Sequence, residues 1–387
     1  MTRTAEISGG GIGGMALGAL LARQGWRVRV HEQSPEIREA GAGIYIKNNS
    51  QEVLENLGVM DRIIDGGTRL ERAQIRFASG EIRQERQLKG SSRVTTFPRQ
   101  TLIEGLRDVA LLHGVDIVTN SKVAGVRDGV LVMADDSRHA ADLIVGADGV
   151  HSAVRTSLNI GGRFTELPTM IDRFMIAREF APELMTIEHW AGNRRIGVTP
   201  AGPDNTYVYM VAPFKDQAAA RLPLDVENWS GRFPKLRRMF EAIHAQPLTK
   251  FTQYPYGFVT CPKWAVGNVA IIGDAAHGLP PTLGQGGGLT LMNAFALASI
   301  LRDAKDVPQA LLEWERRVRF ISDRTQAWSR RYDTFTRGLP ESLNVVRSAV
   351  VWSFGAFPFL NNRMRIADYG LKLADIQVNP QINQGTR

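Results

Sequence analysis

The sequence predicts an α/β fold with two lobes, one built on a parallel sheet and the other on an antiparallel sheet inserted into it. Three observations favour this fold. A glycine-rich turn joins a strand at Ala5–Ser8 to a helix at Met15–Gln24. Two apolar runs, at 143–146 and 268–272, have the length of buried parallel strands, and each is followed closely by an aspartate. From 160 to 260 the chain instead shows short strands separated by Pro, Gly and Asn, as antiparallel sheets do.

The turn after the first strand has the spacing of a dinucleotide-binding fingerprint. Gly9, Gly11 and Gly14 fit the pattern G-x-G-x-x-G between a strand and a helix. Such glycines allow a tight turn, close approach of a pyrophosphate to the backbone, and close packing of the helix on the strand. The second strand, Arg27–His31, ends at Glu32, whose carboxylate can accept hydrogen bonds from both hydroxyls of a ribose. The sequence therefore predicts a dinucleotide site, with an ordinary structural turn as the alternative.

The composition excludes several classes of protein. The 387 residues are 43% hydrophobic and 22% charged, which is typical of a globular protein with a large core. Cys261 is the only cysteine, so no disulfide framework and no cysteine-based metal site is expected. The net charge of +8 comes from scattered arginines without a nucleic-acid-binding motif, and it favours attraction of small anions over nucleic-acid binding. Because the first residues carry no apolar signal segment, we expect a cytoplasmic protein.

The remaining elements of the first lobe follow from periodicity and glycine. Helices are predicted at Ser50–Leu57 and Gln100–His113, and a glycine follows each of them, as is common at helix ends. The stretch Ala73–Arg83 alternates around a Ser-Gly turn and predicts a hairpin. A strand is expected at Asp116–Thr119, with further short strands before residue 133.

The apolar strand at 268–272 returns the chain to the first lobe, which is therefore predicted to be discontinuous. We expect it to comprise residues 1–160 and 262–337, with long helices at its end, and the inserted sheet lobe to comprise residues 161–261. Residues 338–387 are predicted to form a C-terminal helical segment. Within it, the apolar stretch Val345–Leu360 contains charge and proline and is too short to span a membrane. A buried or interface helix is expected there, with attachment to a membrane surface as the alternative.

Three motifs in this order resemble the single-component FAD-dependent aromatic hydroxylases, the family of p-hydroxybenzoate and salicylate hydroxylases. The resemblance extends over about residues 5–330. It implies a Rossmann-like FAD-binding lobe of the p-hydroxybenzoate hydroxylase type, tightly but non-covalently bound FAD, and NADH or NADPH that binds only transiently. The motifs are the opening glycine fingerprint; Asp148-Gly149 with Ser152 and Arg155; and Gly273-Asp274-Ala275-Ala276-His277 with Pro280-Pro281 and Gly284-Gln285-Gly286-Gly287-Gly288.

Several of these residues have a plain physical role beside a flavin. Asp274, at a strand end, can accept a hydrogen bond from a ribityl hydroxyl, and the backbone at 286–288 can face negative charge on the reduced ring. Pro281 lacks an N–H and stiffens the loop. For His277 we favour a structural role in the turn over a catalytic one. The full set of cofactor contacts implied by the resemblance is Gly9, Gly11, Ile12, Gly13, Gly14, Glu32, Gln33, Gly43, Arg99, Val123, Asp148, Asp274, Pro281, Gly286, Gly287 and Gly288.

Within that family, the chain resembles the oxygenases of 2-methyl-3-hydroxypyridine-5-carboxylate, which open the ring of their substrate. The matching residues are Gly41-Ala42-Gly43-Ile44-Tyr45, Arg195-Ile196, Tyr207, Tyr256 and Asn293. The resemblance implies that Arg195 pairs with a substrate carboxylate, while Tyr45, Tyr207 and Tyr256 bond the ring substituents. It also implies that Pro281, Tyr256 and Arg195 lie closest to the reaction. The match is incomplete, because Arg69 and Arg72 lie where those enzymes supply a tyrosine, and Pro280 replaces a different small residue.

The expected function is an FAD-dependent, NAD(P)H-using oxygenase acting through a C4a-hydroperoxyflavin on a small hydroxylated aromatic or pyridine carboxylate, with molecular oxygen as co-substrate. The resemblance favours 2-methyl-3-hydroxypyridine-5-carboxylate or a 5-hydroxynicotinate-like substrate, with hydroxylation alone or with ring opening. Salicylate- or 6-hydroxynicotinate-type hydroxylation is the alternative within the family. Two alternatives lie outside this family of hydroxylases. One is a flavin oxidase or dehydrogenase that needs no NAD(P)H, and the other is a non-catalytic flavin protein that docks a partner. No metal is expected, and a homodimer is an open alternative to the monomer.

Overall fold

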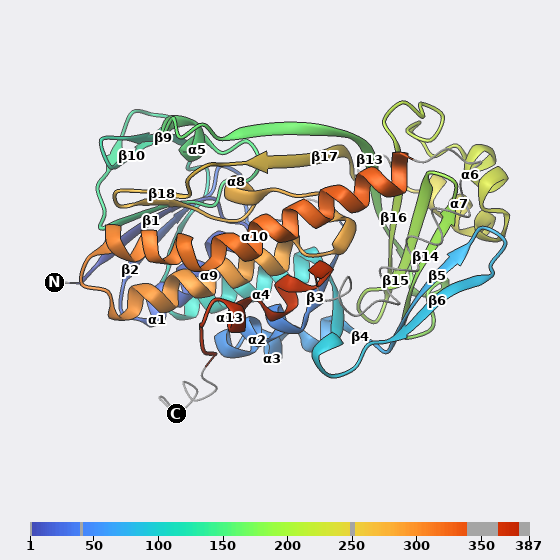
Figure 1. Ribbon diagram of the computed structural model, residues 1–387, viewed down its shortest axis with the longest axis horizontal. Coiled ribbons are helices and arrows are strands. Elements are labelled where there is room, and N and C mark those ends of the chain that lie inside the picture. Colours follow the sequence, from blue (N-terminus) through green and yellow to red (C-terminus); the bar gives the residue numbers. More distant parts are fainter. Residues whose placement is uncertain (1, 39–41, 248–251, 339–362, 379–387) are drawn as a thin grey trace.

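The first lobe is built on a six-stranded sheet (Figure 1). The computed structural model describes residues 2–38, 42–247, 252–338 and 363–378. The sheet has the order β18-β19-β12-β1-β2-β8, and all neighbours are parallel except β18 and β19. Its strands are β1 (Thr4–Ser8), β2 (Arg27–His31), β8 (Asp116–Val118), β12 (Leu143–Gly146), β18 (Ala265–Val266) and β19 (Val269–Ile271). The predicted parallel core is thus present.

The glycine turn brings the first helix directly against the first strand. α1 (Ile12–Arg23) begins three residues before the predicted start at Met15, because the glycines themselves adopt helical geometry. Gly9 has φ +104°, a conformation that other residues rarely adopt, and a Cβ added to Gly14 would lie 2.0 Å from the carbonyl oxygen of Gly9. Only glycine at position 14 allows this approach of helix to strand.

Long helices cover the parallel sheet and reach the second lobe. α1 packs against both α4 (Arg99–Leu112) and α9 (Gly286–Asp303), and α2 (Asn48–Leu57) packs against α9. Gly58 ends α2 in the left-handed conformation, as predicted. α10 (Val307–Gly338) continues past α9 and extends toward the second lobe (Figure 1).

The second lobe contains a seven-stranded sheet in the order β17-β13-β16-β15-β14-β5-β6. Its neighbours are antiparallel except for β14 and β5, which are parallel. The strands are β5 (Arg72–Phe77), β6 (Ile82–Gln87), β13 (Arg163–Ala177), β14 (Met185–Ala191), β15 (Arg194–Pro200), β16 (Asn205–Pro213) and β17 (Thr252–Thr260). The predicted hairpin at 73–83 therefore forms, but it extends this sheet by pairing along β14. The division at residues 161–261 omits it, because a strand pairing through its backbone leaves no signal in local sequence.

Two helices cover one face of this sheet, and the other face is left open. α6 (Val226–Arg232) and α7 (Arg237–His244) bring Trp229 and Phe240 against one face, where they pack with Ile196, Val208 and Met210. Successive side chains of a strand point to opposite faces. The residues between these apolar positions therefore point away from the two helices.

Smaller elements complete the described chain. Two further sheets contain β3 (Gly43–Lys47), β4 (Thr68–Leu70) and β7 (Val94–Pro98), and β9 (Val123–Arg127), β10 (Val130–Met133) and β11 (Arg138–His139). The helical elements are α3 (Met60–Ile63), η1 (Ile64–Gly66), η2 (Gly90–Ser92), α5 (Ala153–Ser157), η3 (Arg178–Phe180), η4 (Pro234–Leu236), α8 (Asp274–His277), η6 (Pro281–Leu283), η8 (Ile366–Tyr369) and α13 (Gly370–Leu373).

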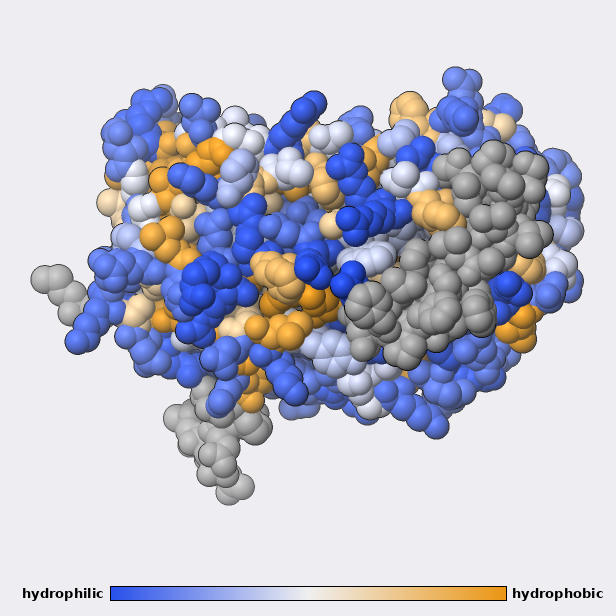
Figure 2. Space-filling model, in the orientation of Figure 1, coloured by the Kyte–Doolittle hydropathy of each residue, from blue (hydrophilic) through white to orange (hydrophobic). Residues whose placement is uncertain are grey.

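The C-terminal prediction is described only in part. Short helices η8 and α13 occur after residue 363, whereas Val345–Leu360 lies outside the described residues. Within the described ranges, no helix is both long and apolar enough to cross a membrane. Figure 2 shows a face on which hydrophilic side chains surround separate hydrophobic patches.

Because the helix and the strand are in close contact at the glycine turn, we expect alanine to lower the free energy of unfolding at Gly14 but not at Gly231. Gly14→Ala places a methyl group 2.0 Å from a backbone oxygen, so we expect a loss of about 1–3 kcal/mol in the free energy of unfolding. Gly231→Ala is the control, because no atom lies within 4 Å of its added Cβ in α6. Urea unfolding followed by circular dichroism measures both variants. Equal stability of the two would contradict the packing described here.

Candidate active site

A cavity of about 830 Å³ is lined by residues of both lobes. The first lobe contributes the turn after β1, the loop after β19 and the first residues of α9. The second lobe contributes the open face of its sheet. Ligands of open α/β sheets bind outside the carboxyl ends of the parallel strands, which is where this cavity begins.

The first-lobe end of the cavity is formed largely by backbone. Gly11, Ile12 and Gly13 line it, as do Gly286 and Gly287 at the first turn of the 18-residue helix α9. A Cβ at position 286 would meet no atom within 4 Å, so this part of the backbone faces open space. Free N–H groups at the starts of two helices suit an anionic ligand.

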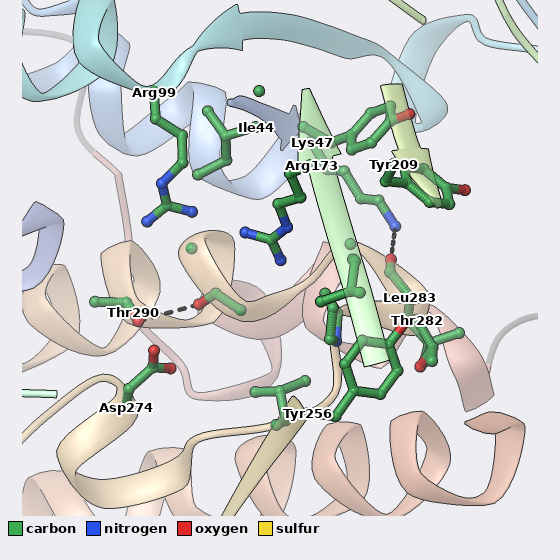
Figure 3. Close-up of a pocket in the computed structure, with 18 of the residues that line it drawn as sticks. Ile44, Lys47, Arg99, Arg173, Tyr209, Tyr256, Asp274, Thr282, Leu283 and Thr290 are labelled. Atoms are coloured by element: carbon green, nitrogen blue, oxygen red, sulfur yellow. Dashed lines mark hydrogen bonds between the residues drawn. The ribbon is translucent and has the colours of Figure 1, made fainter. Parts of the chain in front are cut away.

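Charged side chains face the same space from opposite sides. Figure 3 shows the carboxylate of Asp274 on one side and the guanidinium groups of Arg99 and Arg173 on the other. A carboxylate beside backbone donors fits a ligand that carries both hydroxyl and phosphate groups. These residues therefore fit FAD: N–H groups near residues 11–13 for the pyrophosphate, Asp274 for a hydroxyl, and residues 286–287 for the ring oxygens.

Other predicted cofactor residues lie outside the lining of this cavity. Glu32 accepts hydrogen bonds from the backbone N–H groups of Gly10 (2.9 Å) and Ser34 (2.8 Å), so its carboxylate braces the fingerprint turn. Asp148 accepts from the N–H groups of Ala153 (2.9 Å) and Val154 (3.2 Å) at the start of α5. Gly43, Arg99 and Pro281 do line the cavity, whereas Gly9, Gly14, Gln33, Val123 and Gly288 do not.

The second-lobe end of the cavity is rich in tyrosine. Tyr45, Tyr207 and Tyr256, predicted to hold a substrate, line it together with Tyr209. Burial raises the pKa of each of these phenols, so they stay protonated at neutral pH and can donate hydrogen bonds. Because Tyr209 lies two residues after Tyr207 on β16, strand alternation alone could have identified it.

Arg195 lines the cavity but already has a carboxylate partner. Its Nη1 lies 3.4 Å from Oε1 of Glu188, and only 3% of the residue is exposed. Burial is the largest single effect and would lower the pKa of Arg195, but the Glu188 carboxylate together with the phenols of Tyr256, Tyr332 and Tyr209 holds that pKa above its ordinary value. Glu188 also accepts from the Tyr209 hydroxyl (3.0 Å) and from Nε1 of Trp190 (3.0 Å). The protein itself thus supplies the anion that the sequence assigned to a substrate.

Arg173 is a cation that the sequence prediction missed. It lines the cavity from β13, and no hydrogen bond or ion pair joins its guanidinium to another described residue. The ring of Tyr254 lies 5.1 Å away, an arrangement that holds the side chain without neutralising it. Strand alternation could have identified it: the next residue, Phe174, points to the covered face of the sheet, so Arg173 points to the open face.

A half-buried lysine, Lys47, attaches the loop after α8 to β3. Lys47 Nζ donates to the carbonyl oxygen of Leu283 at 2.6 Å, as the dashed line in Figure 3 shows. Burial lowers the pKa of Lys47 to about 8. Pro281 begins the same short helix, η6, and lines the cavity, so this hydrogen bond positions the predicted flavin loop.

His277 and Asn293 are structural neighbours rather than cavity residues. Both are fully buried, and Nε2 of His277 lies 2.7 Å from Nδ2 of Asn293. Burial lowers the pKa of His277 to about 4, which keeps the imidazole neutral. This arrangement agrees with the structural role expected for His277. Asn293, one of the residues on which the sequence resemblance rests, also donates to Oγ of Ser322 (3.2 Å).

The comparisons with known proteins agree with this geometry. A model of the FAD binding domain matches residues 1–313. A probable 2-heptyl-3-hydroxy-4(1H)-quinolone synthase of Rhodococcus erythropolis is 36% identical, covering 84% of this chain and 87% of that protein. Aurachin C monooxygenase/isomerase of Stigmatella aurantiaca is 30% identical, covering 81% of this chain and 84% of the relative.

Solved structures give the same result for the fold. The tetrameric form of 2-methyl-3-hydroxypyridine-5-carboxylic acid oxygenase is 30% identical, and the match covers 95% of this chain and 96% of that one with a TM-score of 0.84. The family and fold class predicted from the sequence are confirmed. The chain binds FAD and belongs to the FAD-dependent aromatic monooxygenases with the p-hydroxybenzoate hydroxylase-like fold.

Proposed function

We propose that this protein uses NAD(P)H and molecular oxygen to hydroxylate a nitrogen heteroaromatic ring of the 4(1H)-quinolone type. The balanced reaction converts a ring C–H to C–OH while O₂ gives one oxygen atom to the product and one to water. NAD(P)H and one proton supply the two electrons and the hydrogen that this water requires. The observation that carries the proposal is the Arg195–Glu188 pair, since Glu188 already neutralises the arginine that the sequence analysis assigned to a substrate carboxylate.

The relatives support the ring class. The Rhodococcus relative is named for a product with a hydroxyl at position 3 of a 4(1H)-quinolone. The structural neighbour is named for a hydroxypyridine carboxylate, which is also a nitrogen heteroaromatic. The hydroxypyridine carboxylates are the alternative substrate class that the sequence suggests. Arg173 favours them, because its guanidinium has no ion partner among the described residues and could pair with a substrate carboxylate.

The lining of the cavity also supports a substrate with a hydrocarbon substituent. Ile75, Leu88, Val94 and Met364 line the same cavity as the tyrosines. Transfer of a methylene group from water to such a surface contributes about 0.8 kcal/mol. A small pyridine carboxylate has at most a methyl group to place there.

The residues of the chain perform binding, orientation and exclusion of water. Bound FAD supplies the activation of oxygen. The protonated tyrosines can donate to a ring oxygen, and Arg173 can stabilise negative charge that develops on it. Lys47 holds η6 and so fixes one wall of the cavity. Close positioning and a dry site are the main contributions a protein can make to such a reaction.

The cofactor end of the site predicts a selective loss of FAD from Asp274→Ala. The carboxylate hydrogen bond to a ribityl hydroxyl is worth about 1.5–3 kcal/mol, so the dissociation constant should rise about tenfold or more. Titration of the apoprotein with FAD, followed by quenching of flavin fluorescence, measures it. Asp108→Ala is the control, since this exposed carboxylate lies on α4 and pairs with Arg107. If Asp274→Ala retains FAD as Asp108→Ala does, the assignment of the flavin loop is wrong.

The substrate class is tested by a matched panel of ligands. We expect 2-heptyl-4(1H)-quinolone to stimulate NAD(P)H oxidation and to yield a product heavier by one oxygen atom. Neither salicylate nor 6-hydroxynicotinate should do so, because Glu188 already neutralises Arg195, the arginine assigned to a substrate carboxylate. Mass spectrometry and the decrease of NAD(P)H absorbance report both properties. Turnover of 2-methyl-3-hydroxypyridine-5-carboxylate alone would favour the alternative, and oxygen consumption without NAD(P)H would indicate an oxidase.

A further inference from the structure

Glu188 is a half-buried carboxylate in the substrate half of the cavity, and one of its oxygens can accept a further hydrogen bond. Its side chain lies on β14 and is 17% exposed, and the residue lines the cavity. Oε1 receives the Tyr209 hydroxyl at 3.0 Å and Arg195 Nη1 at 3.4 Å. Within the described part of the chain, Oε2 accepts a single hydrogen bond, from Nε1 of Trp190 at 3.0 Å. An ionised carboxylate accepts about four hydrogen bonds, so Oε2 can accept one more.

We propose that Glu188 is the residue that selects the substrate, by accepting a hydrogen bond from the N–H of its heteroaromatic ring. The inference rests on the proposed function and adds a specificity-determining residue to it. A carboxylate in a low-dielectric site repels a second carboxylate and attracts a neutral donor. The pocket therefore favours rings that present N–H over rings that present an anion, although an arginine lies within it.

The carboxylate is held in place from several directions. A Cβ at Gly197 would lie 2.0 Å from the ring of Tyr209, so only glycine leaves room for this ring across β15. That position lets the Tyr209 hydroxyl reach Oε1. Trp190, which donates to Oε2, packs with Tyr332, and Leu283 of η6 packs against this cluster. Glu188 is thus oriented before a ligand binds, and it lies close to the loop that the cofactor contacts.

The same hydrogen bond would also assist the reaction. In a 4(1H)-quinolone the ring nitrogen is conjugated through carbons 2 and 3 to the carbonyl group. A carboxylate that accepts the N–H polarises that bond and increases electron density at carbon 3, the atom that receives oxygen in the proposed reaction. No proton needs to leave the nitrogen, so Glu188 acts by binding and polarisation rather than as a base.

The first test compares two ligands of nearly equal shape. 2-Methyl-4(1H)-quinolone carries the N–H, and 2-methylchromone has an ether oxygen in its place. Isothermal titration calorimetry of the FAD-loaded protein should show the quinolone binding about tenfold or more tightly, the loss expected when a charged acceptor has no donor. Equal affinity for the two ligands would overturn the inference, whatever happens to any variant.

The second test exchanges the charge. Glu188→Gln keeps the shape of the side chain but leaves Arg195 without an ion partner. We expect the preference for quinolone over chromone to fall about tenfold, and the affinity for 2-methyl-3-hydroxypyridine-5-carboxylate to rise by a similar factor. Glu183→Gln is the matched control, because Glu183 forms an exposed ion pair with Arg72 (2.9 Å) outside the cavity lining and should leave all three affinities unchanged.

The outcomes separate this inference from the proposed function. If the wild-type protein binds neither quinolone nor chromone, the proposed substrate class is wrong. If it binds and oxygenates the quinolone but Glu188→Gln preserves the preference over chromone, the function stands and the role of Glu188 is wrong. Thermal unfolding shows whether Glu188→Gln folds. If it does not, the relative affinity of the wild-type protein for quinolone and chromone tests the role of Glu188 by itself.

Discussion

The substrate half of this protein depends on one buried ion pair, Arg195 with Glu188. An uncompensated guanidinium at 3% exposure would be costly, since charges removed from water need a partner. Glu188 supplies that partner. Tyr209 and Trp190 donate hydrogen bonds to its carboxylate and hold it in place, so that its remaining lone pair can accept a hydrogen bond from a ligand. The charge of Arg195 is therefore neutralised within the protein, and the wall of the cavity around it carries a hydrogen-bond acceptor.

The architecture explains why this pair and the cofactor meet in one cavity. The parallel sheet ends at glycine turns and helix starts, whose bare backbone donors line the cavity and fit the phosphates of FAD. The mixed sheet turns its covered face toward α6 and α7, so its other face is left to carry tyrosines and arginines. Lys47, through Leu283, fastens the loop that separates the two halves. Small displacements of this loop would alter both halves together.

Much of this could be predicted from sequence because it depends on local pattern. The fingerprint at Gly9–Gly14 and the aspartate turns identified the family. Tyr45, Tyr207 and Tyr256 line one cavity, and their contact with a substrate stays a prediction. Pairings between distant strands left no such signal: the hairpin of β5 and β6 joined the other sheet, and Glu188 met Arg195 across β14 and β15. The role of Arg195 toward a substrate stays a prediction, and Arg173 was missed because strand alternation was not applied to β13.

Oxygen-18 labelling tests the central claim most directly. The FAD-loaded protein is supplied with NAD(P)H, 2-heptyl-4(1H)-quinolone and labelled oxygen gas, and the product is analysed by mass spectrometry. The account predicts one labelled oxygen atom in each product molecule, with one NAD(P)H consumed for each. Labelled hydrogen peroxide beside unchanged quinolone, or a product whose new oxygen comes from water, would contradict it.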